Sequence, residues 1–285
     1  MTPSLAAPLD ALRSALAEAV RSRVATDDGA SIFTDDGPRW FDDDAVIRTI
    51  HSDASMFVGG LRALLLQSLH PLAMAGVAGH SGYKGDPWGR LQRTSHFLAM
   101  TTFGPAEQAE AVIARIRGIH DGVSGNAPDG RPYSANDPHL LKWVHITEVD
   151  SFLRAHRRFG SSALTVQQRD EYLQQTATVA AKLGVIDPPL TVAELGRTLV
   201  SYRPELAGTS EARDAARYLL VTPPLPLLAR PGYALIAGAA VGTLPAWARR
   251  MLGLPPPVPV ADRLVGELAG QVATRTMRWA MTAPA

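Results

Sequence analysis

Helical periodicity is the feature that most constrains how this chain can fold. Apolar residues recur at steps of three and four along most of its length, and the alternation typical of half-buried strands is almost absent. The first such segment, residues 3–25, carries its apolar stripe at Leu5, Leu9, Leu12, Leu16 and Val20. Several later segments open at a proline or just after one, which suits a first helical turn. The pattern predicts an all-α fold.

The same pattern predicts a single compact domain of roughly ten to thirteen helices. After residues 3–25, helices are expected near 43–51, 54–69, 72–79, 87–102, 105–124, 138–159, 166–183, 192–206, 210–220, 226–242, 245–252 and 261–281. Two proline-rich breaks, Thr222–Pro226 and Leu254–Pro259, are interpreted as ordered corners, because composition does not change across them.

An aspartate-rich stretch, Asp27–Asp44, separates the first helix from the rest. Its spacing does not match an EF-hand loop, so it is interpreted as a solvated loop that ends in a helix N-cap near Asp42–Asp44. Residues 1–40 are therefore expected to form an N-terminal helix and acidic loop, and residues 41–285 the helical body.

Composition excludes several classes of function. The 28 basic and 27 acidic residues give a net charge of +1, so no nucleic-acid partner is expected. The chain has no cysteine, which excludes disulfides, thiolate metal sites and iron–sulfur clusters. Any metal must be held by histidine, by carboxylates or within a cofactor.

The N-terminus has neither a basic region nor an apolar run of the secretory kind, so a cytoplasmic location is expected. The most membrane-like segment, Tyr233–Leu244, is too short to span a bilayer and fits a buried helix better. Peripheral membrane contact stays open, because apolar substrates often reside in membranes. The oligomeric state is not predicted.

Two arginines lie on one predicted helical stripe. Arg90, Arg93, Thr94 and Phe97 fall at positions i, i+3, i+4 and i+7 of the helix over residues 87–102. Such a pair usually belongs to a solvated face. Two guanidinium groups one turn apart also suit the propionates of a haem or an acidic substrate, since each donates a fixed fork of hydrogen bonds.

His145 lies on an apolar stripe of the helix over residues 138–159, together with Leu141, Val149 and Phe152. A histidine in such a place is most often a core residue that bonds a backbone carbonyl. A neutral imidazole in an apolar pocket is also the usual axial ligand of a haem iron. The residue pattern by itself leaves both interpretations open.

The other histidines give weaker signals. His70 and His80 are ten residues apart and share no helical face, so they are no zinc motif, although either could line a pocket. The remaining five have polar neighbours and are expected on solvated faces: His51, His96, His120, His139 and His156.

A set of short motifs, in order, resembles one family of bacterial proteins. The motifs are Leu69-His-Pro71, Gly76-Val-Ala-Gly-His-Ser81, Asp86-Pro-Trp-Gly-Arg-Leu-Gln-Arg-Thr94, Phe103-Gly104, Gly130-Arg-Pro-Tyr133, Asp137-Pro138, Leu141-Lys-Trp-Val-His145, Asp150-Ser-Phe152 and Leu244-Pro-Ala-Trp-Ala-Arg-Arg-Met-Leu-Gly-Leu254. This order is similar to the family grouped with rubber oxygenase (latex clearing protein) and the fungal MpaB oxygenase. The resemblance extends over roughly residues 41–254.

The resemblance implies a large globin-like helical domain that encloses a pocket for haem b. It implies His145 as the axial iron ligand and metal-binding residue, with Arg90 and Thr94 as the matching pair near the haem and Arg93 as a further cation there. It also implies an oxygenase that uses O2 as co-substrate on an apolar or aromatic small molecule.

The chain also departs from the family pattern. Rubber oxygenases are secreted, longer, and use a distal glutamate as a candidate base, whereas no glutamate lies between Ser52 and Thr102 here. If a base is needed, His70 or His80 must supply it, and a small intracellular substrate is expected instead of polyisoprene. The alternatives are a haem-dependent dehydrogenase, peroxygenase or dehydratase, and a non-catalytic helical protein that binds haem or another ligand.

Overall fold

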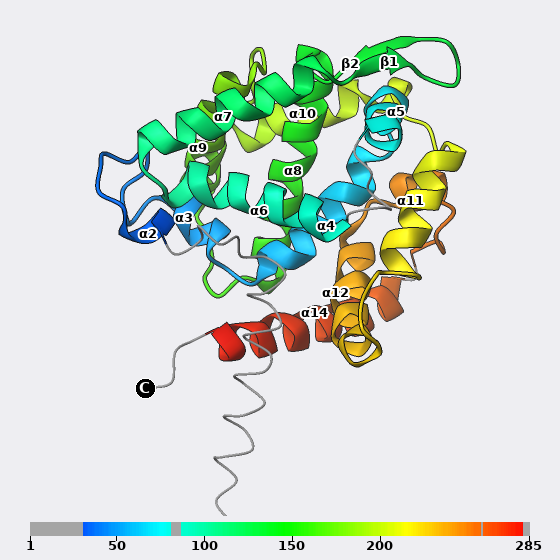
Figure 1. Ribbon diagram of the computed structural model, residues 1–285. Helices are drawn as coiled ribbons and strands as arrows, with labels where there is room; N and C mark the ends of the chain where they lie inside the picture. The colour runs from blue at the N-terminus through cyan, green and yellow to red at the C-terminus, as the bar shows by residue number, and fades with distance from the viewer. Residues whose placement is uncertain (1–30, 81–86, 258, 282–285) are drawn as a thin grey trace, which may run out of the picture.

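The computed structural model describes residues 31–80, 87–257 and 259–281, and it confirms the all-α fold (Figure 1). The helices are α2 (Ser31–Thr34), α3 (Val46–His51), α4 (Ser55–Gln67), α5 (Pro71–His80), α6 (Pro87–Phe103), α7 (Ala106–Asp121), α8 (Pro138–Phe159), α9 (Val166–Leu183), α10 (Val192–Ser201), α11 (Ser210–Leu220), α12 (Arg230–Thr243), α13 (Ala246–Met251) and α14 (Pro259–Met281). The helix predicted over residues 3–25 lies outside the described residues.

Helix α8 occupies the centre of the fold, and its most extensive partner is α4 (Figure 1). Its buried side chains, among them Trp143, Ile146 and Phe152, join those of α4 in one large core cluster. The two helices approach closely at Gly59, where an added Cβ would lie 2.7 Å from Cδ1 of Phe152. The glycine therefore sets how near α8 can lie to α4.

One buried and one partly buried ion pair fix α8 and its surroundings. Arg62 of α4 lies 2.8 Å from a carboxylate oxygen of Asp150, and it also donates to Oγ of Ser151 at 2.7 Å. Arg278 of α14 donates to both carboxylate oxygens of Asp53, each at 3.0 Å. A buried charge needs such a partner, so these pairs restrict the helices to one mutual arrangement.

The structure corrects several predicted boundaries. The helix predicted over 192–206 ends at Ser201 and continues as a 3-10 turn, η1 (Arg203–Glu205), because Pro204 has no backbone N–H to extend the α-helical pattern. The helix predicted over 226–242 is preceded by a second such turn, η2 (Leu227–Ala229), and begins only at Arg230.

Two further expectations were wrong. The segment after α7 forms a small antiparallel hairpin, β1 (Ser124–Asn126) and β2 (Pro132–Ser134), where residues up to 124 were expected to be helical. The N-cap of α3 is Ala45, with no side-chain hydrogen bond, and Asp42–Asp44 are exposed. Asp42 contributes its backbone carbonyl, which accepts from the Ala45 N–H at 3.1 Å.

No single helix in the described ranges is long and apolar enough to cross a membrane. Helices α4 and α5 meet the length and composition test only as a pair, and the chain bends by 105° between them.

Candidate functional site

The helix that carries His145 has well-defined start signals. Asp137 is the N-cap of α8, and its carboxylate accepts from the His139 N–H at 2.8 Å. Pro138 follows in the first turn, where its missing N–H costs nothing. These signals explain why the predicted bounds, residues 138–159, agree with the observed helix.

His145 lies in the third turn of α8 and is half-buried. Burial, assisted by the nearby Lys142 charge, lowers its pKa to about 4, so the imidazole is neutral at physiological pH. Among the described residues, no hydrogen bond to its side chain is present. The imidazole ring thus keeps some solvent-accessible surface, although the surrounding protein removes most of its hydration. This combination indicates a recessed position in which a ring nitrogen can offer its lone pair to a ligand.

Glu148 follows His145 by three residues and shares its face of α8. It is half-buried, and burial raises the pKa of its carboxyl to about 7. The nearby phenol of Tyr172, buried in α9, has a raised pKa through its own burial and the charge of Glu148. The sequence interpretation missed Glu148, although a carboxylate one turn from a histidine on an apolar stripe was a usable signal.

His51 connects four helices in the same region. Its Nδ1 lies 2.8 Å from Oγ1 of Thr102 in α6, and its Nε2 lies 3.0 Å from the hydroxyl of Tyr172 in α9. The edge of its ring meets Phe152 of α8 at a centroid distance of 5.5 Å. Burial lowers the pKa of His51 to about 3, so this histidine is a neutral hydrogen-bonding link.

The expectation that His51 and His156 belong to solvated faces was therefore wrong. His156 is fully buried in α8 near the Asp53–Arg278 pair, and burial lowers its pKa. Polar neighbours in the sequence do not decide burial here, because charged residues one or two positions away point to other sides of the helix.

The residues of α6 that were predicted to face a haem lie on one stripe of the helix, and their side chains are exposed or half-buried. Arg90 is half-buried, whereas Arg93 and Thr94 are exposed. The Thr94 hydroxyl donates to the Arg90 carbonyl at 3.0 Å, a bond within the helix. Helix α6 packs mainly on α7 and α3. The roles of Arg90, Arg93 and Thr94 at a haem remain predictions.

His80 and His70, the two candidates for a base, lie in different surroundings. His80 is exposed at the end of α5, with Nε2 3.1 Å from both the Ser124 carbonyl and the Tyr133 hydroxyl of the hairpin. His70 lies in the turn before α5 and packs near Trp143, which points about 160° away from His145 around α8. Their catalytic roles remain predictions, and neither makes a described contact with His145.

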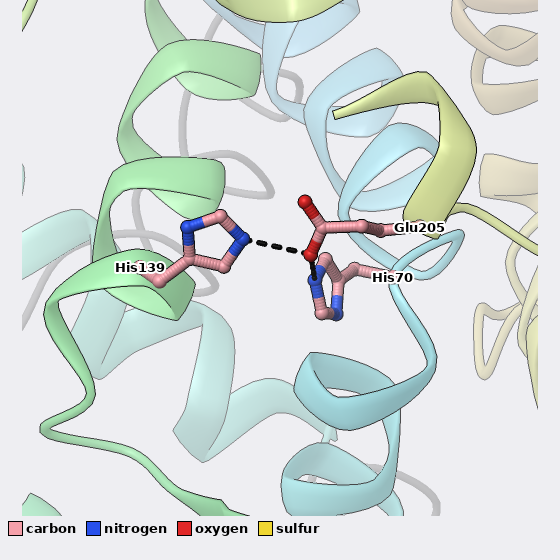
Figure 2. Close-up of side chains that lie close together, drawn as sticks. All are labelled: His70, His139 and Glu205. Atoms are coloured by element: carbon pink, nitrogen blue, oxygen red, sulfur yellow. Dashed lines mark hydrogen bonds and ion pairs between the residues drawn. The ribbon is translucent and has the colours of Figure 1, made fainter. Parts of the chain in front are cut away.

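His70 belongs instead to a cluster with His139 and Glu205 (Figure 2). Nε2 of His139 lies 2.7 Å from Oε2 of Glu205, and Nε2 of His70 lies 3.4 Å from the same oxygen. Sequence reasoning missed this cluster, because its members come from the turn before α5, the start of α8 and η1, which only the tertiary fold brings together.

Comparison with known proteins identifies the family. No curated protein and no solved structure matches the chain. The family model described as "ER-bound oxygenase mpaB/B'/Rubber oxygenase, catalytic domain" matches residues 48–280, which include α4, α6, α8 and both histidine groups. That family supports an oxygenase-type function. The chain therefore belongs to the family of mpaB and rubber oxygenase catalytic domains.

Proposed function

We propose that this protein is a haem b-dependent oxygenase in which His145 is the axial ligand of the iron. The observation that carries this proposal is the state of His145: a neutral, recessed imidazole with no hydrogen bond among the described residues, on the central helix of a domain from an oxygenase family. Axial ligation of haem iron needs an imidazole in this protonation state.

The neighbouring groups fit a buried cofactor. At physiological pH the side chains of His145 and His51 are neutral, and the Glu148 carboxyl is close to the midpoint of its titration. Binding of an apolar macrocycle therefore has to remove little charge from water. Arg90 and Arg93 would hold the haem propionates or a negatively charged oxygen species, since a guanidinium donates two parallel hydrogen bonds to a carboxylate. The bound haem would supply the activation of O2.

The remaining steps belong to residues of the chain. The Glu148 carboxyl, with a pKa of about 7, can hold a proton or release it near neutral pH, one helical turn from His145. The Thr94 hydroxyl would orient O2 near the haem by exchanging its hydrogen bond to the Arg90 carbonyl for one to the ligand. His51, held between Thr102 and Tyr172, keeps α6, α8 and α9 in register around these groups.

We propose an apolar or aromatic small molecule as the substrate. The half-buried side chains of Phe97 and Leu98 lie on α6 one turn beyond Thr94, and Leu98 packs against the main core. Apolar walls of this kind exclude water and favour an electron-rich hydrocarbon over a polar metabolite.

Oxygen uptake by the haem-loaded protein tests this function. The full chain is loaded with haemin, reduced, and supplied with a panel of unsaturated lipids and aromatic compounds. Substrate-dependent O2 consumption, with incorporation of labelled oxygen into product, is expected, and His145→Ala should abolish both. Substrate conversion that continues under strict anaerobiosis would favour a dehydrogenase or dehydratase on the same scaffold. Haem binding without turnover of any compound would favour a non-catalytic binding protein.

A further inference from the structure

Three ligand-type side chains from distant parts of the chain converge on one point, away from the His145 face of α8. They are His70 in the turn before α5, His139 in the first turn of α8, and Glu205 at the end of η1. Their donor atoms all lie within 4.8 Å of one another. Figure 2 shows both imidazole rings directed towards the Glu205 carboxylate.

The hydrogen bonding of His70 is incomplete. Its side chain is only 1% exposed, and neither ring nitrogen has a hydrogen-bond partner in the part of the chain that the structure describes. Buried polar atoms are nearly always paired, so a buried imidazole in this state points to a missing ligand. Its Nε2 is directed at Glu205 Oε2 from 3.4 Å, an ion-pair distance that leaves space between the two atoms for a cation.

Tyr202 holds the His139 side chain in place. The Tyr202 hydroxyl donates its single proton to the His139 carbonyl at 2.9 Å, and its oxygen lies 3.2 Å from Nδ1 of the same residue. Nε2 of the same ring lies 2.7 Å from Oε2 of Glu205, the carboxylate oxygen that His70 Nε2 also faces.

The surroundings resemble the outer shell of a metal site. Metal-bound histidine usually has its second ring nitrogen hydrogen-bonded to an oxygen, and Nδ1 of His139 lies 3.2 Å from the Tyr202 oxygen. The Tyr202 ring also stacks on the His139 ring at a centroid distance of 4.4 Å, which holds the imidazole plane. His139 is thus oriented before any ion binds.

We propose that His70, His139 and Glu205 form a binding site for a divalent transition-metal ion, with zinc as the best fit. Two imidazole nitrogens and one carboxylate oxygen are ligands that zinc accepts, and they leave a fourth position for water. Ligands about 2.0 Å from a tetrahedral zinc lie about 3.3 Å apart, close to the observed 3.4 Å between His70 and Glu205. The shorter His139 contact can open, since both its side chains are 40% exposed or more.

Such an ion would link three segments at one end of the fold. It would join the turn before α5, the start of α8 and η1, and so hold the N-terminal end of the helix whose third turn carries His145. The site is separate from the proposed haem site, so it does not depend on the proposed function.

Calorimetric titration of the full chain with ZnCl2, after removal of metals with a chelator, tests the site. One zinc ion per chain is expected. His139→Ala and Glu205→Gln should each weaken binding by at least about tenfold, because each removes one of three protein ligands. Glu107→Gln, an exposed glutamate in the first turn of α7, is the matched control and should bind zinc like the wild type. His145→Ala should also keep the zinc, which separates this test from the haem proposal.

Thermal unfolding gives a second readout that does not rely on calorimetric heat. With zinc at a hundredfold excess over its dissociation constant, the midpoint should rise by about 5 °C in the wild type and in Glu107→Gln. The rise should be lost in Glu205→Gln, whose metal-free midpoint shows independently that it folds. The site is overturned if the wild type binds no zinc, or if both ligand variants bind it as tightly as the wild type.

Discussion

His145 and Glu148 lie one turn apart on the same face of α8, and burial shifts their pKa values in opposite directions. The pKa of His145 is lowered to about 4, with the Lys142 charge assisting, and that of Glu148 is raised to about 7. Between these values both side chains are uncharged in the folded protein. The haem-free protein therefore keeps two titratable groups neutral on the face proposed to meet an apolar cofactor.

This opposition predicts that His145 and Glu148 together add almost no pH dependence to the stability of the haem-free protein between pH 4.5 and 6.5, on top of the slope that other buried histidines such as His51 contribute. His145 gains protons more readily in the unfolded state, where its pKa is 6.5, so its contribution to stability rises with pH from about 4 to 6.5. Glu148 gains protons more readily in the folded state, so its contribution falls with pH from 4.5 to about 7. The two slopes oppose each other over the shared range.

Single substitutions should reveal how each residue contributes to the change of stability with pH. Between pH 4.5 and 6.5 the free energy of unfolding, measured with urea, should rise by up to about 3 kcal/mol more in Glu148→Gln than in the wild type. In His145→Gln its change over this range should be lower than in the wild type by a similar amount. Both values are upper bounds, because part of each side chain contacts solvent. If the free energy of unfolding changes with pH equally in both variants and the wild type, the opposing contributions of His145 and Glu148 are refuted.

The contact of α4 with α8 at Gly59 predicts a sharp difference between neighbouring glycines. Gly59→Ala places a Cβ 2.7 Å from Cδ1 and 3.2 Å from Cα of Phe152, so it should lower the free energy of unfolding by about 1 to 3 kcal/mol. Gly60→Ala meets no atom of the described residues within 4 Å and should raise it by about 0.5 to 1 kcal/mol, since alanine favours the helix. Equal effects in urea denaturation would show that this contact does not limit the packing.

The α6 stripe predicts a loss of haem affinity. If Arg90 binds a propionate, Arg90→Ala should weaken haemin binding about 10- to 100-fold, the range expected for one hydrogen bond to a charged group. Thr94→Val should have a smaller effect on affinity and a larger one on O2 binding. The matched control is Arg115→Ala, an exposed arginine of α7. Unchanged affinity in Arg90→Ala, measured by absorbance titration, would remove Arg90 from the site.

Local signals in the sequence were sufficient for most of the fold. Asp137 and Pro138 mark the start of α8, and Thr165 forms a capping box with Gln168 at the start of α9, so both helices have the predicted bounds. Strand pairing is a different case, because β1 and β2 are each only three residues long. So short a segment carries no readable alternation.

Candidate site residues could be predicted from the sequence only where they belong to the periodic pattern of a single helix. The stripe on α8 made His145 a candidate, whereas Glu205 stands in a short turn with no periodic pattern to mark it. His139 was assigned to a solvated face because its sequence neighbours are polar. Its relation to His70 and Tyr202 arises from contacts between residues more than sixty positions apart, which local sequence patterns do not encode.

The absorption spectrum of the haemin-loaded protein tests the central claim most directly. The wild type should bind one haemin per chain with a Soret band typical of histidine-ligated haem b. His145→Gly should lose that spectrum and regain it when imidazole is added, since free imidazole can replace the missing ligand. His139→Ala, on the same helix but in the other cluster, should keep it. A His145→Gly variant with the wild-type spectrum and haemin affinity would contradict the assignment of His145 as the iron ligand.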